Sequence, residues 1–196
     1  MVFAAAQEAA AHGYHGLHMR NVAEVAGVST ATIYRYFPSK PRLVVAVLGQ
    51  WLEKFDAEHA AAAFVALNPH QRLQQLMNNL FATMYSRPLL ADAVARAYAL
   101  ADESAADEAE SVRLHMSEMF AEALGHKDFT SDGLAIGALL CDVWLAAMVG
   151  MSQRRITASD FQHRLNTAFR LVTRQAGSQI LRRRLPTALG NLHALT

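Results

Sequence analysis

Cysteine and proline are both scarce in this chain of 196 residues. The single cysteine, Cys141, cannot form a disulfide within the chain and suits the cytoplasm. There are five prolines, and no segment alternates apolar and polar residues over the length of a strand. Because alanine and leucine are frequent as well, the composition favours an all-α fold. No basic residues precede an apolar run at the N-terminus, so we expect no signal peptide.

Net charge is also nearly absent, at +1, and by itself does not indicate a polyanionic partner. The distribution of charge matters more than its sum. Residues 102–110 carry five acidic side chains, whereas residues 20–42 carry one acid, Glu24, and four cations: Arg20, Arg35, Lys40 and Arg42. A local basic footprint of this kind is what phosphate binding requires.

A membrane span is not expected, although residues 133–151 are mostly apolar. Asp142 lies near the centre of this run, where a charged side chain costs about 2.5–3.5 kcal/mol on insertion scales. A helix that is apolar nearly all round is better explained by burial in a core and a subunit interface together.

Signatures of catalysis are missing too: the sequence shows no Ser-His-Asp pattern, phosphate-binding glycine loop or carboxylate pair with an obvious role. His12, His15 and His18 are spaced three apart, but Gly13 and Gly16 interrupt the helix that a metal site would need. We therefore expect no catalytic site, no metal and no cofactor. One class of protein that also needs no catalytic site is a DNA-packaging protein, which would bind all DNA sequences alike and would require no small effector.

The most informative segment is residues 20–40, which has the pattern of a helix-turn-helix. Small and apolar residues recur at the spacing that packs two short helices at a steep angle, and Gly27 suits the turn because positive φ costs it little. Ser29 is placed to cap the second helix. An ordinary helical hairpin has similar spacing, but the polar face of the second helix suits DNA. The residues expected to contact DNA are Arg20, Ser29, Thr30, Thr32, Tyr34, Arg35, Tyr36 and Lys40.

Residues 13–48, and above all the element YRYFPSK at 34–40, resemble the DNA-binding domain of the TetR family of bacterial repressors. The resemblance implies an all-α homodimer with an N-terminal three-helix domain, and a larger C-terminal domain where a small effector lowers DNA affinity. A dimer would place two recognition helices about 34 Å apart in successive major grooves, so the operator should be an inverted repeat of double-stranded DNA.

Within each half-site we assign Thr30 and Thr32 to base edges, and Tyr34, Tyr36 and Lys40 to phosphates, as in TetR-type domains. Arg20 should lie close to the DNA backbone, while Arg35 is left open between phosphate, base and solvent. The sequence departs from the family pattern at residues 17–18, where Leu-His replaces the usual Thr or Ser cap. No basic arm precedes the first helix in this sequence, either because its start has been trimmed or because the protein does without the DNA contacts of the arm.

Three segments of the C-terminal part, residues 97–112, 141–148 and 157–172, are similar to the actinobacterial TetR-type repressors of sterol catabolism. This similarity implies a role in lipid metabolism and a hydrophobic effector, such as a sterol-derived or fatty acyl coenzyme A thioester. A regulator of an efflux pump or another pathway, responding to an unrelated apolar ligand, is the alternative. Whether the protein represses or activates stays open.

The organisation expected from breakers and periodicity is a DNA-binding domain at 1–46, an effector-binding and dimerisation domain at 47–177 and a tail at 178–196. The first helix should end at Gly13, and the fourth should begin with Pro38 in its first turn and run to about Leu67. Further helices are expected at 70–86, 88–103, 105–124, 131–153 and 158–176.

Large flexible and aromatic residues in the middle helices could line an apolar effector cavity or belong to the core. The candidates are Trp51, Phe55, Phe81, Met84, Tyr85, Tyr98, Met116, Met119, Phe120 and Trp144, with Arg72, Arg87 or Arg96 as cations at the mouth. For the dimer interface, the last two helices offer close-approach glycines and an apolar stripe: Gly133, Gly137, Leu140, Phe161, Leu165 and Phe169. The two glycines could equally pack against their own chain.

Overall fold

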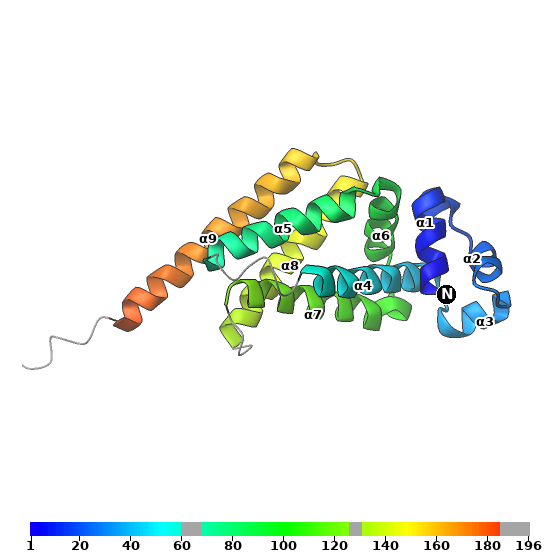
Figure 1. Cartoon of the computed structure of the whole chain (residues 1–196), viewed down its shortest axis with the longest axis horizontal. Coiled ribbons are helices and arrows are strands. Elements are labelled where there is room, and N and C mark those ends of the chain that lie inside the picture. Colours follow the sequence, from blue (N-terminus) through cyan, green and yellow to red (C-terminus); the bar gives the residue numbers. More distant parts are fainter. Residues whose placement is uncertain (60–67, 126–130, 185–196) are drawn as a thin grey trace, which may run out of the picture.

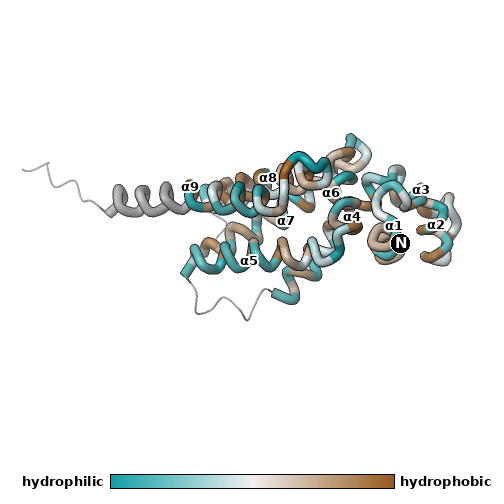
Figure 2. The backbone as a smooth tube through the Cα atoms, turned by 90° about the horizontal axis from the view of Figure 1, so that it is seen from above, coloured by the Kyte–Doolittle hydropathy of each residue, from teal (hydrophilic) through white to brown (hydrophobic). Residues whose placement is uncertain are grey.

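The computed structural model describes residues 1–59, 68–125 and 131–184, and in these three stretches every regular element is a helix. The molecule is elongated, with a small head at one end (Figure 1 and Figure 2). The head comprises α1 (Val2–Gly16), α2 (Met19–Val25) and α3 (Thr30–Tyr36). The body comprises α4 and the helices that follow it. The all-α expectation is confirmed.

Two glycines shape the head. Gly13 has φ 65° and kinks α1 where the sequence predicts that the first helix ends. Gly27, between α2 and α3, has φ 66°, as expected for the turn of a helix-turn-helix. Ser29 caps α3, because its Oγ accepts a hydrogen bond from the backbone N–H of Thr32 at 3.1 Å. The local geometry predicted for this segment is therefore present.

Helix α4 (Lys40–His59) joins the head to the body and passes the expected domain boundary at residue 46 without interruption. The prediction that Pro38 lies in its first turn is wrong. Ser39 precedes the helix and its Oγ accepts the backbone N–H of Arg42 at 3.2 Å, so Pro41 is the proline in the first turn. The expected end near residue 67 lies outside the described residues.

The body continues with α5 (Pro69–Tyr85), which begins with a capping box between Asn68 and Gln71. Next come α6 (Pro88–Ala99), a short 3-10 turn η1 (Glu103–Ala105) and α7 (Ala106–Ala123). The helix expected at 88–103 is shorter than predicted. The Asp102 carboxylate accepts the Ser104 backbone N–H at 3.0 Å and so starts the separate turn η1.

The last two helices are α8 (Ser131–Ser152) and α9 (Ala158–Arg184). Because α9 continues to Arg184, the tail expected from residue 178 is helical over its first part. The stretch Asp132–Ser152 is long and apolar enough to cross a membrane by length and composition alone. In the fold it packs against α6, α7 and α9, which is how a core helix behaves.

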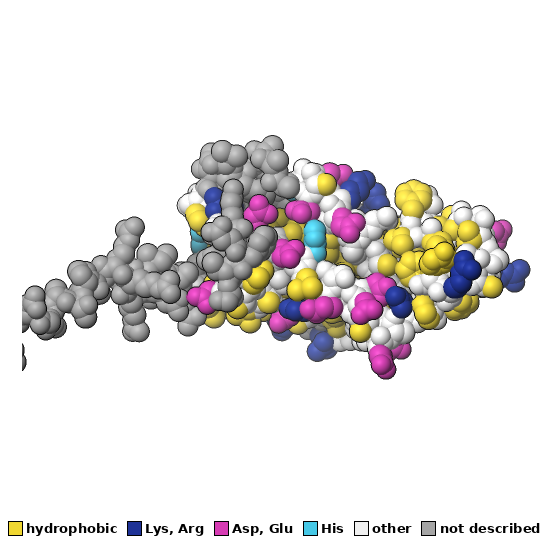
Figure 3. Space-filling model, turned by 90° about the horizontal axis from the view of Figure 1, so that it is seen from below, with side chains coloured by type: hydrophobic (Ala, Val, Ile, Leu, Met, Phe, Trp, Pro, Cys, Tyr) yellow, Lys and Arg dark blue, Asp and Glu magenta, His cyan; other side chains and the backbone are white. Residues whose placement is uncertain are grey.

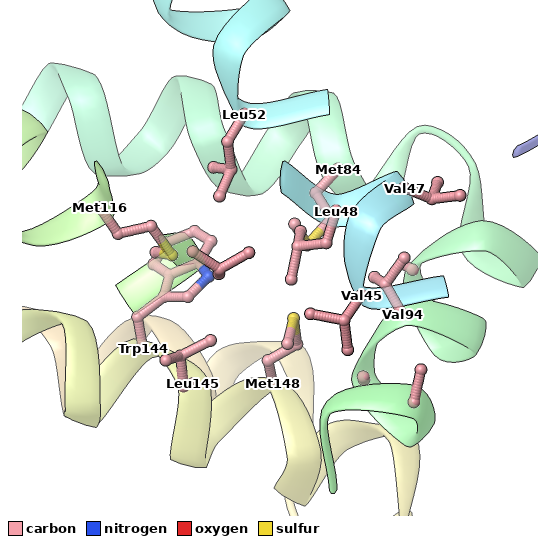
Figure 4. Packing of buried hydrophobic residues seen from close by; sticks show 14 of the residues in the cluster. Val45, Val47, Leu48, Leu52, Met84, Val94, Met116, Trp144, Leu145 and Met148 are labelled. Carbon is pink, nitrogen blue, oxygen red and sulfur yellow. The ribbon is translucent and has the colours of Figure 1, made fainter. Parts of the chain in front are cut away.

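The core of the body is built around α4 and α8 (Figure 4). Side chains from both helices point toward one another, with Met84 of α5 and Met116 of α7 beside them. Cys141 of α8 is fully buried, and burial together with the neighbouring Asp142 carboxylate raises the pKa of its thiol to about 12. The indole N–H of Trp144 points into this cluster and has no hydrogen-bond partner among the described residues.

The residues expected at a dimer interface lie inside the single chain. All six are buried, and Gly137 packs against the backbone of α7. Phe161 contacts the rings of Phe81 and Trp144 at centroid distances of 4.9 Å each. These side chains therefore have little surface to offer a partner, and the periodic apolar stripe belongs to the core. The set is Gly133, Gly137, Leu140, Phe161, Leu165 and Phe169.

The close approach of α7 and α8 predicts that Gly137→Ala destabilises the protein. A Cβ at this position would overlap the carbonyl oxygen of Ser117 and lie 3.3 Å from the backbone N of Ala121, so a helix backbone must move. We expect a loss of about 2–3 kcal/mol in the free energy of unfolding, measured by urea denaturation.

Gly49→Ala is the matched control, because a Cβ there would meet the Cγ2 of Val112 at 3.8 Å, an ordinary contact. It should raise the free energy of unfolding by about 0.5–1 kcal/mol through helix propensity. Equal effects of the two substitutions would show that α7 and α8 are not held at this distance.

Candidate DNA-binding surface and effector pocket

The outer face of α3 is polar and exposed. Tyr34 and Tyr36 are 48% and 54% exposed, so much of both side chains is accessible to a partner. Thr30 is exposed and Thr32 is half-buried, with its Oγ1 2.9 Å from the Oγ of Ser29. Ile33 is fully buried and anchors the opposite face of the helix. Phenols and hydroxyls are thus presented on a short helix with a fixed base.

Two cations of this region lie over aromatic rings. The Nζ of Lys40 lies 4.3 Å from the ring centroid of Tyr14, and the guanidinium carbon of Arg35 lies 5.1 Å from that of Tyr36. Partial burial lowers the pKa of Lys40 and raises that of Tyr14. Tyr14 is a partner that the sequence patterns did not indicate, because it comes from α1, outside the helix-turn-helix.

Arg20 is exposed in the first turn of α2, on the same head. The residue before this helix, His18, makes no side-chain capping hydrogen bond. Figure 3 shows lysine and arginine side chains both at the tip of the head and on the body, and acidic side chains mostly over the body. The acidic side chains of residues 102–110 belong to the body, at η1 and α7.

One cation of the expected basic footprint, Arg42, forms an ion pair with the body. The Nε of Arg42 donates to Glu108 Oε1 of α7 at 2.7 Å, and both side chains are largely buried. Next to this pair, the hydroxyls of Ser39 and Ser104 are 2.8 Å apart. These two contacts fasten the start of α4 to η1 and α7. They join residues 65 and 66 positions apart, so no local pattern could have revealed them.

A pocket of about 470 Å³ lies at the junction of head and body. Its walls come from α1, α4, the end of α5 and the start of α6, and Trp51 and Phe55 are the two expected effector residues that line it. Phe3 and Ala6 of α1 line it too and were not predicted. A smaller hollow beside it is shared by Trp51, Arg87 and Met84, so three of the expected aromatic and methionine residues lie at these cavities.

The other expected effector residues do not line these two cavities. Phe81 and Tyr85 pack on Phe161, while Phe120 lies next to Trp144 at a centroid distance of 6.5 Å. Burial and the Asp92 carboxylate raise the pKa of Tyr85 to about 12, so its phenol is neutral. The set that lies in or against the core is Phe81, Tyr85, Tyr98, Met116, Met119, Phe120 and Trp144.

Of the three arginines expected at the mouth, Arg87 lines both cavities. Arg72 donates to the carbonyl of Ala123, and Arg96 bonds to Asp92 and to the carbonyl of Ser152. These last two arginines therefore brace helix ends. Among the described residues, no group of three histidine, cysteine or acidic side chains is placed to hold a metal ion.

Comparison with known proteins agrees with this geometry. The profile "Bacterial regulatory proteins, tetR family" matches residues 2–47, and "Tetracyclin repressor-like, C-terminal domain" matches residues 67–172. The chain is 41% identical to the HTH-type transcriptional repressor KstR of Mycolicibacterium smegmatis over 160 residues, covering 82% of this chain and 78% of that protein. The KstR of Mycobacterium tuberculosis is 39% identical, over 82% and 73%.

The fold has solved counterparts as well. A TetR transcriptional regulator from Rhodococcus sp. RHA1 superposes with a TM-score of 0.76 at 23% identity, over 88% of this chain and 92% of that one. The head with its capped recognition helix, the helical body and both sequence profiles all indicate the same family. The chain therefore belongs to the TetR family of bacterial regulatory proteins.

Proposed function

We propose that this TetR-type transcriptional repressor binds an inverted-repeat operator as a homodimer in the cytoplasm and is released from it by a hydrophobic effector. The observation that carries the proposal is the exposed polar face of α3, with its two half-exposed tyrosines. A helix that follows a fixed turn and presents phenols, hydroxyls and cations suits the major groove of DNA.

On this surface, Thr30 and Thr32 are proposed to read base edges, whereas Tyr34, Tyr36 and Lys40 bind phosphates. Ser29 supports the reading face through its hydrogen bonds to Thr32. Lys40 must leave the Tyr14 ring, or rotate on it, to reach a phosphate. Arg20 in the first turn of α2 adds a phosphate contact, and Arg35 lies beside Tyr36 at the edge of the same face.

The effector class is proposed from the relatives. The KstR proteins are HTH-type transcriptional repressors, and they share about 40% of their residues with this chain over most of both lengths. The C-terminal segments 97–112, 141–148 and 157–172 resemble actinobacterial repressors of sterol catabolism. A sterol-derived or fatty acyl coenzyme A thioester is therefore the first candidate. The junction pocket of about 470 Å³, lined by Trp51, Phe55 and Leu90, suits a ligand that is largely hydrocarbon.

A dimer face different from the one first expected is proposed on α8 and α9. Leu139 is 52% exposed and Leu171 is 61% exposed. On α8, Ala135, Leu139, Asp142 and Ala146 are exposed positions three or four residues apart, so they form one stripe. The two alanines allow a second copy of the helix to approach closely beside Leu139.

The first experiment is a fluorescence anisotropy titration of the full chain against inverted repeats taken from the upstream region of its own gene, at controlled salt. Repeating it with sterol and fatty acyl coenzyme A thioesters tests release. We expect tight binding that one ligand class abolishes. Binding that is weak and indifferent to sequence would instead favour a packaging role.

The DNA assignments predict different outcomes for phosphate and base contacts. Lys40→Ala should weaken binding to all sequences alike and reduce the slope of log K against log salt by about 1. Thr32→Ala should relax sequence preference at one base pair, and it keeps the cap because Ser29 bonds the backbone N–H. Binding to operator variants at several salt concentrations measures both effects.

Arg155→Ala serves as the control for net charge, because Arg155 is exposed in the turn that follows α8, outside the head and the junction pocket. It should leave the salt slope unchanged. If Thr32→Ala leaves sequence preference untouched, the reading face lies elsewhere on the head.

If this is the dimer face, Leu139→Glu and Leu171→Glu should each weaken dimerisation roughly 30-fold or more. Each substitution would bury an unpaired charge in the interface, which costs about 2–5 kcal/mol. Sedimentation equilibrium measures the dimer constant. Leu114→Glu on α7, also 48% exposed in the chain, is the control and should leave it unchanged. A dimer constant that all three variants leave intact would place the interface on other helices.

A further inference from the structure

We propose that the junction pocket between α1, α4, α5 and α6 is a binding site for an amphipathic anion, and that the DNA-binding head supplies one of its walls. The effect of the ligand on DNA binding rests on the proposed function, whereas the class of ligand is inferred from the residues that line the pocket. It places the effector at the boundary of the two domains rather than within the core of the body.

The apolar part of the pocket is an aromatic wall on α4. Trp51 stacks on Phe55 at a centroid distance of 5.5 Å and an interplanar angle of 24°, and Phe55 stacks on His59 at 4.1 Å and 18°. Phe3 of α1 also lines the pocket and is 70% exposed. A cavity of about 470 Å³ with aromatic side chains from two helices in its lining suits a hydrocarbon ligand.

The polar part of the pocket is cationic. Arg87 and Lys54 line it together with one carboxylate, Glu58, whose Oε1 is 3.8 Å from the Lys54 ammonium. Two cations against one acid leave one positive charge. Among the ion pairs and side-chain hydrogen bonds of the described residues, none involves Arg87, so its planar guanidinium can bind a carboxylate through two parallel hydrogen bonds.

The ligand chemistry follows from these two parts. A long apolar body fits between Phe3 and the α4 rings, and one acidic group pairs with Arg87. The hydroxyl-bearing residues Thr83 and Ser86 line the same end. A neutral molecule of the same shape would leave Arg87 unpaired, and a cation would be repelled. A free carboxylate and a thioester with phosphates both supply the anion, and the test below separates them.

A ligand in this site acts on the head through α1. Phe3 and Ala6 precede the Gly13 kink, and Tyr14 follows it, with Lys40 over its ring. One helix thus carries both a wall of the pocket and the support of a lysine that is proposed to bind DNA phosphate. A ligand that fills the pocket fixes α1 relative to α4 and α6. Because ligand and operator then favour different settings of the head, each lowers the affinity for the other by the same factor.

The chain offers a built-in reporter, since it has two tryptophans, Trp51 in the pocket and Trp144 in the core. In the full-length Trp144→Phe variant, titration with oleate should change the emission of Trp51 with saturation. Oleyl alcohol, which has the same chain without the charge, should bind at least tenfold more weakly. Lithocholate and oleoyl coenzyme A, titrated in the same way, distinguish a ring system from a chain and a carboxylate from a thioester.

Two pairs of variants locate the site. Arg87→Met should weaken oleate binding at least tenfold, whereas Arg155→Met, an exposed arginine away from the pocket, should not. Phe3→Ala should weaken it severalfold, whereas Leu100→Ala, an exposed leucine outside the pocket, should not. If Trp144→Phe does not fold, isothermal titration calorimetry on these four variants with both tryptophans retained gives the same comparison.

Outcomes for the pocket and for DNA binding are read separately. No change of Trp51 emission with any of the three anions, or affinity unaltered by Arg87→Met and Phe3→Ala, overturns the inference even if the operator is bound tightly. Oleate binding that needs Arg87 supports the site even if no operator is found, in which case the proposed function fails. Saturating ligand that leaves operator affinity unchanged overturns the coupling through α1.

Discussion

The burial of α4 is the constraint on which the rest of the structure depends. This helix packs against α1, α6 and α7 at once, and seven of its side chains are buried on several sides. Its first turn is fastened to η1 and α7 through Ser39 and Arg42, while its middle lines the junction pocket. Because interiors are close-packed, a displacement of α4 cannot be absorbed locally and must be passed to the head or the body.

Local chemistry explains why the head could be predicted from sequence. The turn glycine, the serine cap and the buried Ile33 act over a few residues, so their spacing alone determines the geometry. The order of the body helices followed from Asn68-Pro69 and Arg87-Pro88 in the same way. The misplaced helix start at Pro38 and the overlong helix at 88–103 have one cause: a short polar side chain, Ser39 or Asp102, supplied the cap.

The pocket and the dimer face could not be predicted because they depend on which face of each helix points toward its neighbours. Aromatic and methionine residues at helical spacing look alike whether they line a cavity, as Trp51 does, or fill the core, as Phe120 does. Helix α8 is apolar on nearly all sides, so its sequence does not indicate which face is buried. In the fold Leu140 is buried and Leu139 is exposed.

The position of Cys141 has a consequence for chemical reactivity. The thiolate is the form of cysteine that attacks oxidants, alkylating reagents and disulfides, and this thiol is fully enclosed and has a pKa raised to about 12. The sole cysteine of the chain is therefore inert toward redox signals while the fold is intact. A cysteine introduced on the surface can accept a spectroscopic label selectively, with the native residue left in place, so distances between head and body can be followed in solution.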